Sequence, residues 1–148
     1  MKTLLKEAWT LAVETLSWME MQKLSERLAL AKTVKQLDIS DANAIRLAHT
    51  LVCETVRRQN FIDTFINNAL KPKSISEFNL GVQAFLRLYV YQTRIAKNWS
   101  KIDLEEAENI AKLARSILGW KTLRKVEHIL GVLLTQKPKS ILDGASDE

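Results

Sequence analysis

Apolar residues recur at intervals of three and four along most of this 148-residue chain. That spacing is typical of helices with one buried face. The stretch at 80–96, LGVQAFLRLYVYQTRIA, differs because its apolar residues cover nearly every direction of a helical wheel. A helix that is apolar on most sides is enclosed by other helices. We therefore expect a central core helix here, with one basic edge formed by Arg87 and Arg94, which are seven residues apart.

Six further helices are predicted around this segment. Apolar stripes alone indicate four of them, at residues 3–21, 25–37, 61–70 and 123–135. Ser40 or Asp41 can cap a helix that ends near residue 58. Asp103, with Glu106 three residues later, has the spacing of a capping box for a helix that ends near residue 118. The pattern predicts an all-α fold, a single bundle of about seven helices around a central buried helix.

Composition supports one helical domain. The chain has only four Gly and two Pro, and 47% of its residues are hydrophobic, which is enough for a core. We expect this domain to occupy residues 1–136 and a flexible tail to occupy 137–148, where Pro138 and Gly144 change the composition. No apolar run approaches the roughly 18 residues that cross a membrane.

The N-terminal apolar run is interrupted by Glu7 and Glu14 and does not fit a signal peptide. We therefore expect a cytoplasmic protein. The single cysteine, Cys53, excludes an internal disulfide and agrees with a reducing compartment. The net charge of +5 and the pI of about 9.4 favour nucleic acid or another polyanion as a partner.

The sequence offers little for catalysis. A methyltransferase needs a glycine-rich loop after a strand, whereas the four glycines here are scattered among predicted helices. Cys53 lies within a helix, where a lone cysteine is usually structural, and His49 and His128 do not have metal-ligand spacing. The acidic run at 103–108 suits helix capping better than metal binding. We expect no enzyme, no cofactor and no metal.

Three blocks resemble the NusB family in their order and spacing: AFLRLYVYQTRI, IDLEEAENIAKLAR and KVEHILGVLL. Upstream, AIRLAHTLVCETVRRQNFIDTFINNAL is similar to a helix pair in the NusB-like N-terminal domains of RNA cytosine-5 methyltransferases. The resemblance spans most of residues 8–134. It implies a fold of about seven helices and an RNA-binding role. Free-standing members act in transcription antitermination with a small ribosomal-subunit protein, and fused members help a methyltransferase engage rRNA.

The chain departs from the antitermination members in two places. Their Arg-rich N-terminus is represented here only by Lys2 and Lys6, and the last helix has Glu127-His128 where Asn-Gly is usual. The Arg57–Arg58 pair fits the methyltransferase-associated branch better.

The candidate RNA contacts are basic residues, which bind phosphates, and one aromatic residue that can stack on a base. They are Lys2, Lys6, Arg57, Arg58, Arg94, Lys97, Trp99, Lys121, Arg124 and Lys125. For each cation the alternative is plain solvation, and Trp99 and Trp120 could instead cover the core. Arg87 is expected to pair with an internal carboxylate, whereas Arg94 is expected to contact RNA.

Two functions follow. The first is a non-catalytic RNA-binding domain for rRNA or a structured transcript. The alternative is a helical adaptor that docks a ribosomal, transcription or methyltransferase protein.

Overall fold

The computed structural model describes residues 2–99 and 103–136, apart from the side chains at positions 2 and 3. Seven α-helices follow one another, with a short 3-10 helix before α5 and a π-helical segment directly after it. The bounds are α1 Lys2–Gln22, α2 Glu26–Leu37, α3 Ala42–Arg57, α4 Gln59–Leu70, η1 Ile75–Glu77, α5 Leu80–Val90, η2 Tyr91–Ile95, α6 Leu104–Leu118 and α7 Trp120–Thr135. The predicted all-α fold is confirmed. The expected tail at 137–148 lies outside the described residues.

Side-chain caps fix several helix starts where the sequence suggested them. The Oδ1 atom of Asp41 accepts hydrogen bonds from the first turn of α3, and Oδ1 of Asp103 accepts one from the Glu106 N–H at 3.1 Å. The expected return contact from Glu106 to the cap is replaced by an ion pair, because Glu106 Oε2 lies 3.2 Å from Lys97 Nζ. Gly119, with φ of 85°, separates α6 from α7 in a conformation that favours glycine.

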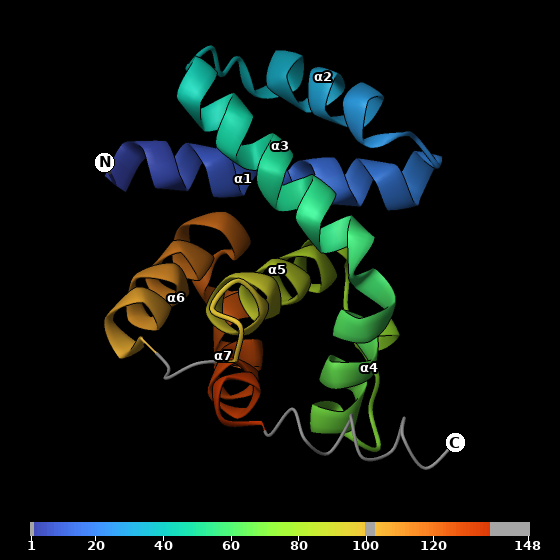
Figure 1. Ribbon diagram of the computed structural model, residues 1–148, viewed down its shortest axis with the longest axis vertical. Coiled ribbons are helices and arrows are strands. Elements are labelled where there is room, and N and C mark those ends of the chain that lie inside the picture. The colour runs from blue at the N-terminus through green and yellow to red at the C-terminus, as the bar shows by residue number, and fades with distance from the viewer. Residues whose placement is uncertain (1, 100–102, 137–148) are drawn as a thin grey trace.

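Helix α5 is the centre of the fold, as predicted. It packs against α1, α3, α4, α6 and α7. In Figure 1, α1 and α3 cross above it, while α4 and α6 lie on opposite sides. Its buried residues are Val82, Ala84, Phe85, Leu86, Leu88, Tyr89 and Val90. Helix α2 completes the upper layer by packing on α1 and α3.

The predicted helix at 80–96 is not α-helical throughout. After Val90 the chain widens into the π-helical segment η2, in which the Ala96 N–H donates to the carbonyl oxygen of Tyr91 at 2.7 Å. A π turn holds one more residue than an α turn, so the residues beyond it are rotated by about 100°. Arg87 and Arg94 do not form an exposed basic edge, because only 11% of the Arg87 side chain and 7% of Arg94 are exposed, so that prediction is wrong.

Among the described residues, no helix combines the length and hydropathy that a membrane crossing requires.

Candidate nucleic-acid interface

Arg94 was expected to be exposed to RNA, but it lies in the core with only 7% of its surface exposed. Its Nη1 atom donates to the carbonyl oxygens of Leu133 and Leu134, at 2.7 and 2.9 Å. The guanidinium also lies 5.5 Å from the ring centroid of Phe65 and 5.1 Å from that of Trp99. Burial lowers the pKa of Arg94 from its ordinary value. The structure thus gives Arg94 an internal role, and its guanidinium is not part of an exposed interface.

Trp99 covers the core instead of facing solvent. Asn98 and Trp99 both have positive φ, of 51° and 59°, and this turn folds the indole back over α4. The ring lies 5.8 Å from that of Phe61 and 5.3 Å from that of Phe65. Of the two roles expected for Trp99, the structure shows packing on the core, which leaves its ring in contact with Phe61 and Phe65.

Arg87 has the structural role that was expected for it. Its Nε and Nη2 atoms donate to the two carboxylate oxygens of Asp63, at 2.8 and 3.1 Å. Only 11% of the Arg87 side chain is exposed. This bidentate pair joins α5 to α4.

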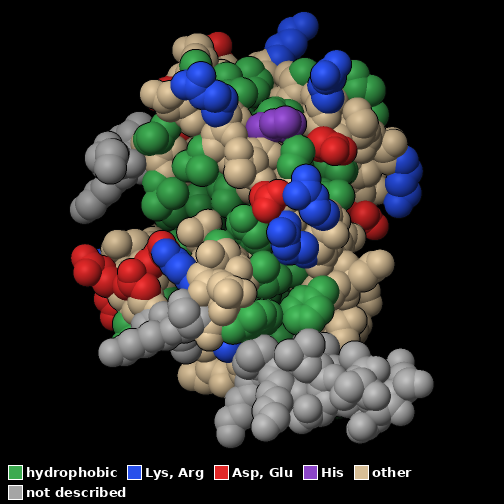
Figure 2. Space-filling model, in the orientation of Figure 1, with side chains coloured by type: hydrophobic (Ala, Val, Ile, Leu, Met, Phe, Trp, Pro, Cys, Tyr) green, Lys and Arg blue, Asp and Glu red, His purple; other side chains and the backbone are tan. Residues whose placement is uncertain are grey.

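Two of the proposed basic clusters are partly neutralised by carboxylates. Arg57 and Arg58 each lie 3.0 Å from a carboxylate oxygen of Glu54, and Arg58 also lies over the ring of Tyr91. Lys97 is paired with Glu106. On the face shown in Figure 2, Lys and Arg side chains are spread among acidic and apolar ones and form no single patch.

At the N-terminus, Lys6 is exposed on α1. The side chain of Lys2 lies outside the described residues.

Helix α7 presents a different arrangement. Lys121, Arg124, Lys125 and His128 are all exposed and follow one another at spacings of three, one and three, which places them on one side of the helix. In the part of the chain that the structure describes, none of the four belongs to an ion pair. The guanidinium of Arg124 lies 5.2 Å from the ring of Trp120, which is 56% exposed.

The turn after α4 adds two lysines to this side of the molecule. Lys71 and Lys73 are exposed and line the same pocket as Lys125 and His128. We define the α7 basic surface as Lys71, Lys73, Lys121, Arg124, Lys125 and His128. Lys71, Lys73 and His128 were not among the RNA contacts expected from the sequence. Some fifty residues separate the turn at 71–73 from α7, so the sequence could not show that their charges meet. Its only signal for the two lysines was charge next to a helix end.

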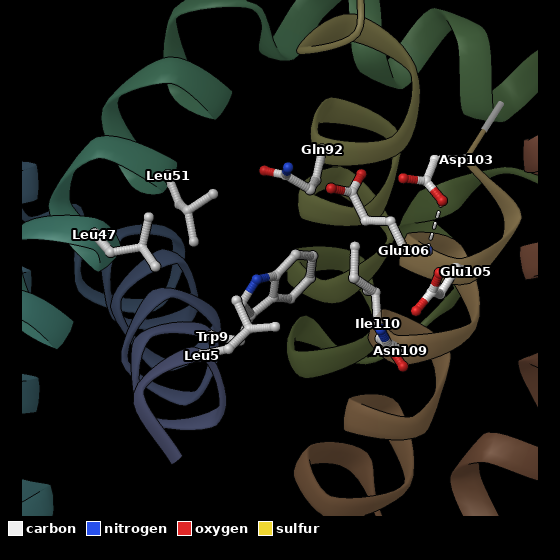
Figure 3. Close-up of a pocket in the computed structure, with 10 residues that line it drawn as sticks. All are labelled: Leu5, Trp9, Leu47, Leu51, Gln92, Asp103, Glu105, Glu106, Asn109 and Ile110. Carbon is white, nitrogen blue, oxygen red and sulfur yellow. Dashed lines mark hydrogen bonds between the residues drawn. The ribbon is translucent and has the colours of Figure 1, made fainter. Parts of the chain in front are cut away.

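A second cavity, of about 360 Å³, lies among α1, α3, η2 and α6. Figure 3 shows Trp9, Leu47 and Leu51 on one side of it and the acidic start of α6 on the other. The acidic groups are largely engaged, because Asp103 caps α6 and Glu106 binds Lys97. Within residues 2–99 and 103–136, no three His, Cys, Asp or Glu side chains group as metal ligands.

Helix α3 carries the single cysteine of the chain, Cys53. Its Sγ lies 3.3 Å from His49 Nε2. Burial, followed by the charge of Glu26, raises the pKa of the thiol. A raised pKa disfavours the thiolate that nucleophilic chemistry requires.

Over the described residues the fold is an all-helical bundle, and α7 carries an exposed cationic face. The model of the NusB family matches residues 6–119, about three quarters of the chain. The chain belongs to the NusB family.

Two solved structures share the fold. One, described as antitermination factors NusB and NusE in complex with dsRNA, gives a TM-score of 0.75 at 23% identity, over 93% of this chain and 100% of that one. The other, described as a plectonemic RNA supercoil, gives a TM-score of 0.74 at 24% identity, over 88% of this chain and 93% of that one. Comparison with curated protein sequences gives no match.

Proposed function

We propose that the protein is a non-catalytic RNA-binding member of the NusB family and that it binds RNA through the α7 basic surface. The observation that carries the proposal is the difference in charge pairing. Arg57, Arg58 and Lys97 share their charge with nearby carboxylates, whereas the six side chains of the α7 basic surface have no such partner among the described residues. Unpaired, exposed cations are the groups that bind phosphates most strongly, because binding them breaks no ion pair.

The ligand of this surface is rRNA or a structured transcript. Family membership supports RNA as the ligand class, and so does the occurrence of RNA in both similar solved structures. Exposed Trp120, held beside Arg124, adds an aromatic face on which a base can stack. Lys6 is a secondary candidate contact, and so is Lys2.

A protein partner is the second candidate function, and a specific groove favours it. The cavity shown in Figure 3 shares Leu5, Leu47 and Asn109 with a neighbouring cavity of about 540 Å³ that extends along α6 to Ser116. The larger cavity is mostly apolar and also has Lys112 in its lining, whereas the smaller one is mixed and has Asp103 and Glu105 at one end. Acidic groups repel RNA, so this groove suits an apolar protein segment with a basic residue at its end.

Such a segment could belong to a small ribosomal-subunit protein, in line with the NusE-bound neighbour, or to an RNA methyltransferase. Replacing Leu47 with Glu should abolish binding of such a partner and leave RNA binding unchanged.

The direct test of RNA binding compares two matched variants at low salt. Lys121→Ala/Arg124→Ala/Lys125→Ala removes three unpaired charges, and Arg57→Ala/Arg58→Ala removes two paired ones. The first variant should lose RNA affinity by at least tenfold, whereas the second should stay within about threefold of the parent. Equal losses, or no loss in the triple variant, would reject the α7 basic surface.

A further inference from the structure

A pocket of about 330 Å³ opens within the α7 basic surface. It lies between the end of α4, the turn that follows it, and α7. Its lining is largely apolar, formed by Ala69, Leu70, Pro72, Phe78, Ile129 and Val132. Four cationic or imidazole side chains also line it, namely Lys71, Lys73, Lys125 and His128.

This combination selects a particular kind of ligand. The apolar lining, with the ring of Phe78, suits a flat aromatic group, and the lysines suit anions attached to that group. A nucleotide has both parts in one molecule. The volume is at the lower end for ligand pockets, so it suits one nucleotide and not a stacked run of bases.

A base can enter such a pocket only when it is unpaired. In an A-form duplex the bases are stacked and paired inside the helix, and a protein reaches mainly the phosphates and 2′-hydroxyls. Unpaired bases in loops, bulges and single strands can turn outward and stack on aromatic side chains. The pocket therefore distinguishes unpaired from paired RNA, which the surrounding charges alone cannot do.

We propose that this pocket receives the base of one unpaired nucleotide of the bound RNA, while Lys71, Lys73 and Lys125 bind the adjacent phosphates. The inference rests on the proposed RNA-binding function and deepens it. In this account the basic side chains set the overall affinity for RNA, and the pocket sets the preference for unpaired RNA.

The test fills the pocket without changing its charge. Val132 lines the pocket and is 39% exposed, so Val132→Trp can occupy the space without disturbing the core. Thr135→Trp is the matched control, because Thr135 is exposed on the same helix and does not line the pocket. Urea unfolding of both variants checks that the fold is retained.

The probes are short oligouridine and oligoadenosine single strands and the duplex annealed from the same two strands. The parent protein should bind at least one single strand more tightly than the duplex. Val132→Trp should weaken single-strand binding about tenfold and leave duplex binding unchanged, since one stacked base contributes that much. Thr135→Trp should change neither.

The remaining outcomes separate the two proposals. If the parent binds RNA but Val132→Trp weakens both forms equally, or weakens neither, the pocket assignment is wrong and the RNA-binding function stands. If the parent binds neither single strands nor duplex at low salt, the proposed function fails, and the inference fails with it.

Discussion

The Nη1 atom of Arg94 lies 2.7 Å from the carbonyl oxygen of Leu133, so a buried cation from η2 holds the end of α7. The last carbonyls of a helix lack intrahelical donors and carry partial negative charge. Arg94 satisfies two of them, and the rings of Phe65 and Trp99 enclose its guanidinium. This contact fixes the helix that presents the proposed RNA surface.

Arg94→Met should destabilise the fold by about 3 kcal/mol, because two charge-assisted hydrogen bonds are lost and two carbonyls lose their donor. Urea unfolding followed by circular dichroism measures the change. Arg94→Lys should recover part of the loss, since one ammonium can reach only some of the same acceptors. A loss below about 1 kcal/mol in Arg94→Met would mean that these hydrogen bonds contribute little.

The Arg87–Asp63 pair makes a second stability prediction. Asp63→Asn leaves the largely buried Arg87 charge without its counter-ion and should cost about 2–3 kcal/mol. Glu54→Gln is the control, because it removes the carboxylate from two ion pairs that are more exposed than Arg87–Asp63. It should lower the free energy of unfolding by less than about 1 kcal/mol. Similar unfolding midpoints for the two variants would contradict the difference in burial.

The buried hydroxyl of Tyr89 should make the folded protein less stable at alkaline pH. Burial raises the pKa of its hydroxyl to about 12, against an ordinary value of 10, and the nearby charge of Arg94 opposes the shift. Above pH 10 the unfolded chain releases this proton while the folded protein keeps it. The contribution of Tyr89 to the free energy of unfolding is therefore complete below pH 10. It is lost as the pH rises toward 12, by up to about 1.4 kcal/mol per pH unit.

Tyr89→Phe should flatten that part of the stability curve. The measurement is the urea midpoint between pH 9 and pH 12 for the parent and the variant, with absorbance at 295 nm to follow tyrosine ionisation. If the two curves stay parallel across this interval, Tyr89 is not the group responsible.

The fold was largely predictable because its signals are local. Helical periodicity and capping residues together located all seven helices, with Asp41 and Asp103 marking two of the helix starts. The uniformly apolar stretch identified the central helix. The π-helical segment η2 carries no comparable local signal in the sequence.

The main error in the candidate site concerns Arg94, which lies in this π-helical segment. Its guanidinium binds the end of α7, a contact between residues some forty positions apart that local periodicity does not signal. The partners of Arg57, Arg58 and Lys97 also depend on side-chain geometry, although Glu54 lies within one helical turn of the arginines. Lys71 and Lys73 lie beside α7 only because the chain folds back, a tertiary contact that the sequence does not reveal.

The central claim is that unpaired charge on the α7 basic surface binds RNA, and the salt dependence of RNA affinity tests it most directly. Each phosphate contact to a single strand contributes about 0.7 to the slope of log K against log salt concentration. We predict that Lys121→Ala/Arg124→Ala/Lys125→Ala reduces the magnitude of this slope by about 2, and that Arg57→Ala/Arg58→Ala changes it by less than about 0.7. An unchanged slope in the α7 triple variant would contradict the account.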